Sequence, residues 1–323
     1  MKKIDVTALG ELLIDFTENG VSPQGNPLLE ANPGGAPCNV LSMLSKLGHK
    51  TAFIGKVGAD AFGRSLRDTI ARAGIDTTGL VEDEKVHTTL AFVHTLADGD
   101  RDFSFYRNPG ADMMLTPADV KEDLLLNCRI FHFGSLSMTA EECRKATEDS
   151  VEVAKHAGAL ISFDPNLRPP LWENLYTAKE RILFGLEHCD ILKISDNEIE
   201  WLTGEMDYRK AVDRIKAKYD IPLVLVSLGK QGSLAFSDGA YAEAPAYRVN
   251  AIETTGAGDT FGACVLHYIL ENGFRCYKKS ELEEMLAFAN AAAAIITTRK
   301  GALAVMPGKD EIEALMKSNE ISV

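Results

Sequence analysis

Short β-rich runs, each followed by a helical pattern, recur along the chain and constrain its fold more than any other feature. Residues 51–58 (TAFIGKVG) precede a helical pattern at 60–74, and residues 129–137 (RIFHFGSLS) precede one at 140–158. Further members of the series are strand-like runs at 158–166 and 222–229 and a helical pattern at 178–189. This alternation is typical of βαβ units, which build a mostly parallel sheet covered by helices on both faces. We therefore expect an α/β fold.

Composition narrows the class of protein. A chain of 323 residues fits one large α/β domain. Its net charge of −13 argues against a general nucleic-acid or anionic-membrane surface, and no apolar run approaches the roughly 20 residues that span a bilayer. The start, MKKIDVTALG, lacks the apolar region of a signal peptide. The six cysteines form no C-x-x-C pair and the seven histidines show no metal-ligand spacing, so we expect a cytoplasmic protein without a disulfide framework or a zinc site.

One segment breaks the βα rhythm. Residues 88–107 (TTLAFVHTLADGDRDFSFYR) contain two alternating strand patterns around Asp98-Gly99, a pair that tolerates the positive φ angles of tight hairpin turns. Because successive side chains of a strand point to opposite faces, Phe103, Phe105 and Arg107 share one face. Either this stripe is a solvated strand end, or the hairpin is a flap whose inner face closes over a ligand.

A second unusual segment is rich in glycine and proline. Residues 19–39 (NGVSPQGNPLLEANPGGAPCN) are predicted from composition to be the only long irregular segment. A loop of that length in a compact domain is more often functional than idle. Within it, Gly34 and Gly35 precede Asn39, so backbone N–H groups and one amide are placed either to bind hydroxyl groups or to form a simple loop and helix cap.

The segment ETTGAGDTFGA, residues 253–263, places closely spaced glycines and an acid directly before an apolar run. Glycines let the backbone approach a bulky anion, and the first turn of a helix offers unpartnered N–H groups at the positive end of the helix dipole. The segment therefore predicts a phosphate cradle. Asp259 would repel an anion there unless it accepts a proton, which suggests a general base for a substrate hydroxyl. The alternative is a structural acid that complements the helix dipole.

Two other phosphate-binding motifs are disfavoured. The dinucleotide fingerprint belongs to a first βαβ unit and has an acid about 20 residues further on, at the end of the next strand. Here the glycines come late in the chain, position 261 is Phe rather than Gly, and no strand pattern clearly follows the helix. The Walker A pattern occurs nowhere in the sequence, so P-loop phosphate binding is also disfavoured.

Polar groups also follow two further strand patterns. The ligands of open α/β sheets gather at the carboxyl ends of strands. The segment SFDPNLRPPLW places Asp164, Asn166 and Arg168 in such a position, and KISDNEIEWLTG does the same with Asn197, Glu198 and Glu200. Charges like those of the second group are also typical of a solvated first helical turn.

Taken together, these motifs resemble those of the ribokinase-like (PfkB) family of sugar and nucleoside kinases. The resemblance runs from GELLIDF (10–16) through GGAPCN (34–39) and TTGAGDTFGA (254–263) to TRKGALAVMP (298–307). Within the family, FYRNPGADMML (105–115) and DPNLRPPLW (164–172) look most like bacterial and plant fructokinases. The resemblance implies a single domain, 1–323, folded as a three-layer α/β/α sandwich. It also implies a small β-sheet lid, built from segments at about 12–33 and 88–108, that often forms a homodimer interface.

The family pattern assigns roles to matching residues. Asp259 would be the base that activates the acceptor hydroxyl, with Gly256, Ala257 and Gly258 as the anion hole. The residues implied to bind the sugar are Asp15, Gly34, Gly35, Asn39, Arg107 and Arg168. Those implied to surround the nucleotide are Asn197, Ser227, Gly229, Gly232 and Asn290. Glu200 fits an N-x-x-E element that acts indirectly on Mg²⁺. A K⁺ loop would use mainly the backbone of Glu253, Thr255, Ile296, Arg299 and Gly301.

The implied activity is that of an ATP-dependent phosphotransferase with an alcohol acceptor, and the expected reaction converts D-fructose to D-fructose 6-phosphate. Another sugar such as 2-keto-3-deoxygluconate stays open as the acceptor, as does a non-catalytic sugar-binding regulator. A nucleoside kinase would need aromatic platforms for a base, and no clear pair is visible. Glu253 stands where many relatives have Asp, and Ile296 stands at a frequently small position, so K⁺ activation also stays open. Cys38 replaces a common Ala, which we interpret as a packing change.

Overall fold

The computed structural model describes residues 2–95 and 101–320. Its largest element is a sheet with the strand order β13-β12-β11-β10-β9-β8-β1-β4-β5. The strands are β1 Ile4–Leu9, β4 Thr51–Gly58, β5 Ile75–Asp83, β8 Cys128–Gly134, β9 Leu160–Asp164, β10 Ile191–Ser195, β11 Leu223–Ser227, β12 Ser233–Ser237 and β13 Ala240–Ala244. All neighbours from β5 to β11 pair in parallel, and only the pairs β11–β12 and β12–β13 of this described sheet are antiparallel. The predicted α/β class is confirmed.

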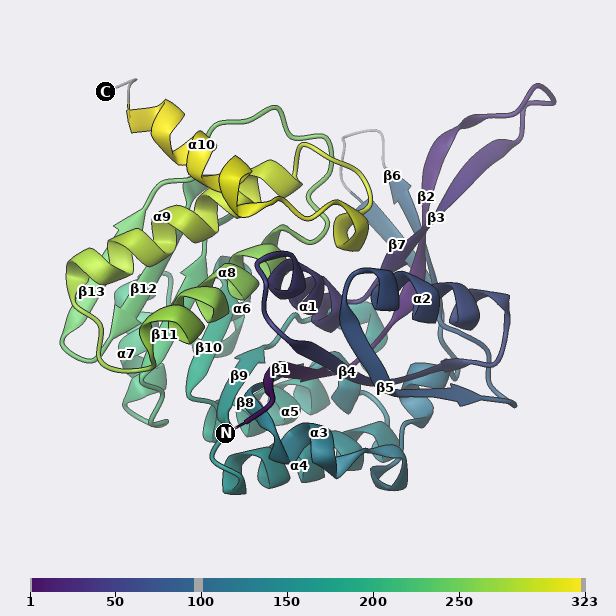
Figure 1. The fold of residues 1–323 in the computed structure, drawn as a ribbon, viewed down its shortest axis with the longest axis horizontal. Helices are drawn as coiled ribbons and strands as arrows, with labels where there is room; N and C mark the ends of the chain where they lie inside the picture. Colours follow the sequence, from purple (N-terminus) through teal and green to yellow (C-terminus); the bar gives the residue numbers. More distant parts are fainter. Residues whose placement is uncertain (1, 96–100, 321–323) are drawn as a thin grey trace.

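Helices cover both faces of this sheet, which makes three layers (Figure 1). One face packs against α1 Ala36–Lys46, α2 Ala61–Arg72, α8 Ala257–Asn272, α9 Lys279–Ile296 and α10 Lys309–Glu320. The other packs against α3 Glu122–Leu126, α4 Glu141–His156, α5 Leu175–His188, α6 Asp196–Thr203 and α7 Tyr208–Lys216. Short 3₁₀ segments lie at Ala111–Met114, Pro117–Asp119, Pro169–Leu171, Leu136–Met138, Gly229–Gln231 and Ala302–Val305. None of the described helices combines the length and apolar character of a membrane span.

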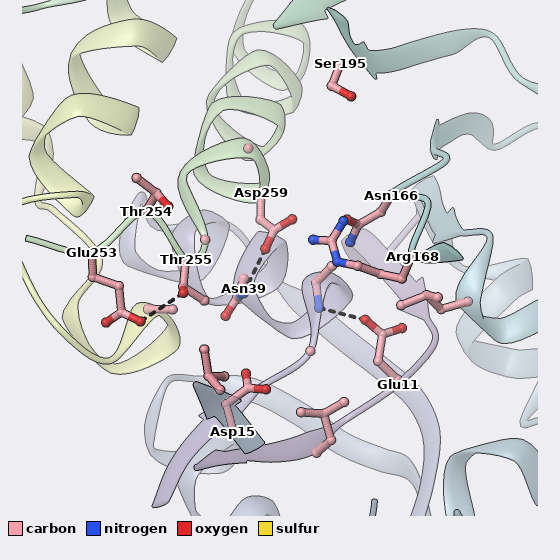
Figure 2. Close-up of a pocket in the computed structure, with 18 of the residues that line it drawn as sticks. Glu11, Asp15, Asn39, Asn166, Arg168, Ser195, Glu253, Thr254, Thr255 and Asp259 are labelled. Carbon is pink, nitrogen blue, oxygen red and sulfur yellow. Dashed lines mark hydrogen bonds between the residues drawn. The ribbon is translucent and has the colours of Figure 1, made fainter. Parts of the chain in front are cut away.

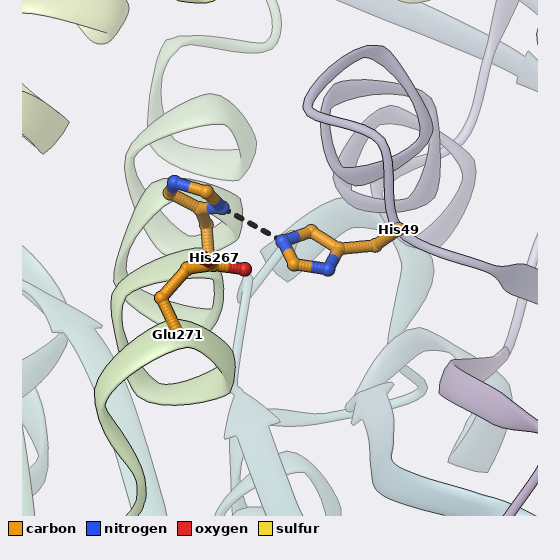
Figure 3. A group of neighbouring side chains, drawn as sticks. All are labelled: His49, His267 and Glu271. Atoms are coloured by element: carbon orange, nitrogen blue, oxygen red, sulfur yellow. Dashed lines mark hydrogen bonds between the residues drawn. The ribbon is translucent and has the colours of Figure 1, made fainter.

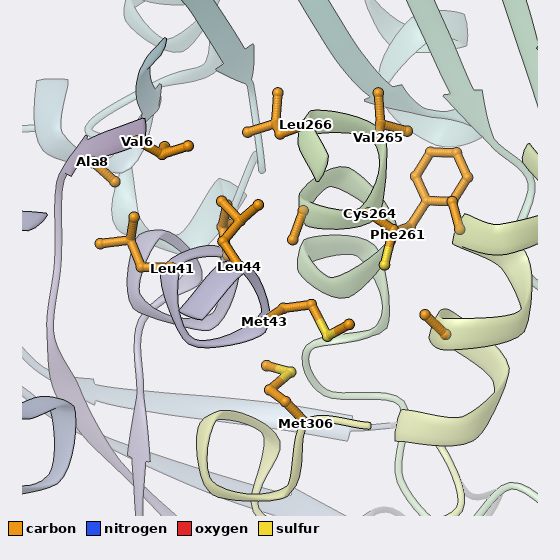
Figure 4. Packing of buried hydrophobic residues seen from close by; sticks show 14 of the residues in the cluster. Val6, Ala8, Leu41, Met43, Leu44, Phe261, Cys264, Val265, Leu266 and Met306 are labelled. Carbon is orange, nitrogen blue, oxygen red and sulfur yellow. The ribbon is translucent and has the colours of Figure 1, made fainter. Parts of the chain in front are cut away.

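The packing of α1 against α8 positions the start of both helices. Leu41, Leu44 and Leu266 are at most 2% exposed and lie in one core cluster with Phe261 and Cys264 (Figure 4). Full burial of a side chain the size of Leu is worth about 1.5–3 kcal/mol. Because several such side chains interlock, the two helix N-termini are held in one relative position, at the same edge of the sheet.

The chain changes direction across the large sheet next to β1. It runs from β1 to β4 and β5 on one side, then returns to β8 on the other side of β1. In open α/β sheets ligands bind outside the carboxyl ends of the strands at such a switch point. The segments that follow β1, β9, β10 and β11 therefore surround the expected site.

A smaller sheet has the order β3-β2-β6-β7 and is formed by β2 Leu13–Val21, β3 Pro27–Gly34, β6 Leu90–Thr95 and β7 Arg101–Tyr106. The β2–β3 hairpin projects away from the large sheet (Figure 1). The expected β6–β7 hairpin is present as an antiparallel pair, and its predicted turn at Asp98-Gly99 lies outside the described residues.

The prediction that residues 19–39 are irregular is wrong. Strand β2 extends to Val21, β3 covers Pro27–Gly34, and α1 begins at Ala36. Pro27 and Pro33 are tolerated because β3 is an edge strand, where a missing N–H donor need not interrupt a ladder. Composition alone therefore indicated the wrong local structure for this segment.

Candidate active site

A cavity of about 790 Å³ opens at the carboxyl ends of β1, β9, β10 and β11, a volume typical of small-molecule sites. The small sheet forms one wall. Leu13, Asp15 and Thr17 of β2 line the cavity at alternate positions, and Phe105 and Arg107 do the same at the end of β7. The inner face of the small sheet is thus turned toward the cavity.

Arg107 is not a solvated strand end, because its side chain is 4% exposed. Its guanidinium bonds the Asp112 carboxylate at 2.7 Å, the Thr139 hydroxyl at 2.9 Å and the Leu136 carbonyl at 3.2 Å. Most of its N–H donors are therefore engaged by the protein. Arg107 shapes the cavity wall and has little donor capacity left for a ligand.

Asp259 lies in the first turn of α8, at the cavity wall (Figure 2). Its Oδ2 accepts a 2.7 Å hydrogen bond from the side-chain amide of Asn39, which lies in the first turn of α1. Burial raises the pKa of Asp259, and the Asn39 hydrogen bond and the positive charges of Lys193 and Arg168 oppose that rise. A buried carboxylate beside an open volume is suited to accept a proton from a ligand hydroxyl.

The segment predicted to be a phosphate cradle forms the N-terminus of α8. Gly256 is the N-cap at φ 79°, a left-handed conformation that favours glycine, and Gly256 and Gly258 both line the cavity. A Cβ at position 258 would lie 3.1 Å from Nζ of Lys193. The absence of a side chain there leaves room for a group between the helix N-terminus and this ammonium. Ala257 does not line the cavity, although its backbone belongs to the same turn.

Lys193 is a cation at the cavity that sequence reasoning missed. It is the middle residue of β10, its side chain is 13% exposed, and its Nζ lies 2.9 Å from Oδ2 of Asp164. Burial by itself would lower the pKa of Lys193, but the carboxylates of Asp164, Glu198 and Asp259 raise it overall. The signal that could have identified it is a lysine inside an otherwise apolar strand, where an unpaired charge would be costly.

Glu11 was also missed, although GELLIDF contains it. It follows β1 at the switch point, is 6% exposed, and accepts a 2.9 Å hydrogen bond from the Ala36 N–H at the start of α1. Burial raises the pKa of Glu11 to about 7. Gly35 allows this contact, since it has φ 126° and a Cβ there would lie 2.4 Å from the Glu11 carbonyl oxygen. A Cβ at Gly34 would collide with Asp15, and Gly34 itself does not line the cavity.

Arg168 brings a second positive charge to the cavity. It follows β9, is exposed, and donates to the Leu167 carbonyl at 3.2 Å, which leaves most of its guanidinium donors for a ligand. Its neighbour Asn166 adopts a positive φ of 43° and also lines the cavity (Figure 2). Because Asn tolerates this conformation better than most residues, the sharp turn DPNLR directs both side chains toward Asp259.

The residues that follow β10 only partly occupy the positions expected from the sequence. Ser195, Asn197 and Glu198 line the cavity, whereas Glu200 does not. The Glu198 carboxylate accepts from the Ser195 N–H and hydroxyl and from the Leu167 N–H at 2.7 Å, which ties the ends of β10 and β9 together. Glu200 accepts from the Tyr208 hydroxyl at 3.4 Å.

Of the remaining expected nucleotide residues, Ser227 and Gly229 line the cavity and Gly232 and Asn290 do not. The Asn290 amide donates to the Ala244 and Pro245 carbonyls and accepts from Ser233, so it holds β12, β13 and α9 together.

Of the residues expected to form the cation loop, some line the cavity and others do not. Glu253, Thr255 and Gly301 line the cavity, and Ile296 and Arg299 do not. The Glu253 carboxylate accepts from the Thr255 hydroxyl at 2.9 Å and from the Gly301 N–H at 3.3 Å. Arg299 bonds the Val305 carbonyl and pairs with Glu311. The loop before α8 is therefore tied to the loop after α9.

Comparison with known proteins places these features in context. Residues 3–309 match the model of the "pfkB family carbohydrate kinase". Fructokinase-1 of Oryza sativa subsp. japonica is 42% identical over 97% of this chain and 98% of its own. A fructokinase from Xylella fastidiosa, solved with bound ATP, superposes with a TM-score of 0.90 at 32% identity over 99% and 100% of the two chains. A double mutant of a Vibrio cholerae O395 fructokinase, solved with fructose, ADP and potassium ion, gives 0.85 at 26% identity over 98% and 99%.

Proposed function

This chain belongs to the pfkB family of carbohydrate kinases, and on that premise we propose that it is an ATP-dependent fructokinase that makes D-fructose 6-phosphate. The observation that carries the proposal is the position of Asp259, whose buried carboxylate faces the cavity in the first turn of α8. A hydroxyl acceptor, its base and the phosphate cradle can meet only at such a point. The fructokinase names of its full-length relatives supply the sugar.

In this proposal the sugar lies between the small sheet and α1. Asp15 and Asn39 line that part of the cavity and offer hydrogen-bonding groups of the kind that bind sugar hydroxyls. Gly35 permits close approach of the backbone, and Arg107 holds the wall in place. The 6-hydroxyl would point to Asp259.

The phosphoryl group would lie at the N-terminus of α8. Backbone N–H groups of Gly256, Ala257 and Gly258 are the anion hole of the proposal, and Lys193 and Arg168 supply positive charge beside it. Asp259 takes the proton of the 6-hydroxyl while the sugar oxygen bonds to the γ-phosphorus and the bond to the β-phosphate oxygen breaks. Phosphoryl transfer of this kind depends mainly on positioning and charge stabilisation.

The residues present fit a Mg–ATP complex. Mg²⁺ is usually held by one or two carboxylates together with the phosphates, and Asp196 and Glu198 both line the cavity. When bound, the ion would neutralise phosphate charge. Asn197, Ser227 and Gly229 stay in the proposal as nucleotide contacts. Glu200, Gly232 and Asn290 would act only through the residues they support.

A K⁺ ion fits the protein less well. Glu253, Thr255 and Gly301 lie at the cavity, but Ile296 and Arg299 are outside its lining, and the Ile296 carbonyl already accepts the Arg299 N–H. We therefore assign no step to K⁺. Turnover in KCl against tetramethylammonium chloride tests this directly.

The small sheet is proposed to act as a lid. Its inner face lines the cavity, so movement toward α8 would exclude water and limit ATP hydrolysis. Homodimerisation through this lid and a cytoplasmic location belong to the same proposal.

The test is ADP release with Mg–ATP over fructose, ribose, 2-keto-3-deoxygluconate, glucose and adenosine, using wild type and Asp259→Asn. We expect turnover with fructose that falls by roughly 10² or more in the variant, as for a lost general base. Asp60→Asn is the control, because Asp60 is also a helix-starting acid but caps α2 outside the cavity.

Each outcome separates the alternatives. Turnover with another sugar only would keep the kinase mechanism and discard fructose. Sugar binding without ADP release would favour the non-catalytic regulator. An Asp259→Asn variant as active as Asp60→Asn would reduce Asp259 to a structural acid.

A further inference from the structure

A group of possible metal ligands lies outside the candidate active site, and the proposed mechanism uses none of them. His49 follows α1, and His267 and Glu271 lie in the second half of α8 (Figure 3). One ligand atom from each of the three lies within 4.8 Å of the others, and Nε2 of His49 is 2.7 Å from Nδ1 of His267. The sequence could not pair these residues, since they are 218 positions apart.

The surroundings of His49 resemble those of a histidine that binds a metal. Its other ring nitrogen, Nδ1, lies 3.9 Å from Oδ2 of Asp5. Asp5 is itself held by the Lys50 N–H at 2.9 Å and by Arg129 at 3.1 Å. Histidines that bind metals usually turn the second nitrogen to a carboxylate, which orients the ring. Asp5 is placed to do this if Nε2 binds an ion.

Two positively charged side chains lie near this group of ligands. The positive charge of Arg129 is paired with Asp5, and Lys309 is a nearby exposed cation that works against binding.

We propose that His49 Nε2, His267 Nδ1 and a carboxylate oxygen of Glu271 bind a divalent transition-metal ion of the Zn²⁺ class, with water completing the coordination. Two imidazoles and a carboxylate are a donor set that suits Zn²⁺. Bonds of about 2.0–2.1 Å in a tetrahedral arrangement put the two nitrogens about 3.3 Å apart, so the rings separate by roughly 0.6 Å and lose their shared hydrogen bond. Glu271 is exposed and can rotate to reach the ion.

The position of the proposed metal site means that a bound ion would link α1 to α8. The amino ends of α1 and α8 carry Asn39 and Asp259, which bond one another in the candidate active site. The proposed metal site joins the opposite end of α8 to the residue just after α1. The ion would therefore clamp the same helix pair from its far end and stabilise the folded state by mass action.

The experiment uses tag-free, chelator-treated full-length protein carrying Cys276→Ser, since Cys276 is exposed and thiols bind Zn²⁺. Zn²⁺ affinity is measured by calorimetry without nucleotide, and Co²⁺ is added to read the visible absorption of a four-coordinate site. We expect one Zn²⁺ per chain. Glu271→Gln and His267→Gln should each weaken its affinity by about 10-fold or more, and Asp5→Asn by about 10-fold.

Glu271→Gln is the decisive variant, because an exposed side chain can be changed without disturbing the core. His188→Gln is the control, since His188 also contacts a glutamate, Glu152 at 3.0 Å, but lies on the other helix layer. Equal Zn²⁺ affinity in wild type, Glu271→Gln and His267→Gln would overturn the proposal. So would Co²⁺ binding without the absorption of a four-coordinate site.

Discussion

The side-chain amide of Asn39 donates a 2.7 Å hydrogen bond to Oδ2 of Asp259, across 220 positions of sequence. Asn39 is 3% exposed, so this hydrogen bond is shielded from water. It favours the ionised form of the Asp259 carboxylate. The proposed base is therefore held in place and kept ready for a proton by a residue of another helix.

Removing that bond should change the pH dependence of catalysis. Burial raises the pKa of Asp259 and the Asn39 bond opposes the rise, so Asn39→Ala should raise the pKa further. A base works only when unprotonated, and the acidic limb of kcat/KM should then move to higher pH. Activity at neutral pH should fall by roughly 10-fold, as for a lost bond to a charged group. A pH–rate profile checks this. Asn174→Ala, which removes the cap of α5 outside the cavity, should leave the limb where it is.

Two glycines of α8 offer a matched pair. An Ala at 258 would add a methyl 3.1 Å from Lys193 Nζ, whereas at 262 it would meet nothing within 4 Å. Both changes favour the helix by about 0.5–1 kcal/mol. We expect Gly258→Ala to fold well but lose up to about 10²-fold in kcat/KM for ATP, because the cradle is displaced. Gly262→Ala should keep full activity. Equal activity of the two variants would mean that no phosphate lies beside Gly258.

The role of Lys193 can be separated from its contribution to stability. Lys193→Met leaves the buried Asp164 without its partner, and Lys56→Met removes the partner of Asp83 and Asp119, which are partly exposed and lie outside the cavity. Breaking a buried pair costs about 3–5 kcal/mol, so Lys193→Met should unfold at lower urea concentration, and Lys56→Met, whose partners are partly exposed, should lose less stability. Only Lys193→Met should reduce kcat/KM for ATP beyond the loss of folded protein. A parallel loss of activity in Lys56→Met would remove the phosphate role from Lys193.

Glu11 should make the folded protein less stable at higher pH. Its pKa is about 7 in the folded protein, against an ordinary value of 4.5, so the folded state binds this proton more tightly than the unfolded state. Between these values the folded state holds more protons, and the free energy of unfolding falls as the pH rises. Glu11→Gln keeps an oxygen for the Ala36 N–H and removes the titration. It should stabilise the protein at pH 8 by up to about 3 kcal/mol and leave pH 4 nearly unchanged, measured by urea unfolding. An unchanged pH dependence would show that Glu11 has the same pKa in the folded protein as in the unfolded chain.

Local patterns predicted much of the architecture. The run TAFIGKVG became β4 without a change of boundary, the pattern at 60–74 became α2, and Gly256 precedes α8 as the glycine motif indicated. The prediction for residues 19–39 was wrong because their glycine and proline content was interpreted as a loop, although an edge strand tolerates proline.

Residue spacing alone could not show which acid of the segment after β10 lines the cavity. Ser195 and Glu198 share a capping box at the start of α6, so both lie at the end of β10 beside the cavity. Glu200 comes two positions later, about 200° further around the helix, and lies outside the cavity lining. The choice between neighbouring acids depended on where the helix begins relative to the strand.

Features that depend on neighbouring residues could be predicted from the sequence: the alternation of strands and helices, the glycine turn before α8, and the acid that follows it. Which distant groups meet depends on how the elements pack. Asn39 reaches Asp259, and His49 reaches His267, because α1 packs against α8 through a shared core. Lys193 meets Asp164 because β10 lies next to β9 in the sheet. Contacts of this kind arise from packing between elements far apart in the chain, and no local preference encodes them.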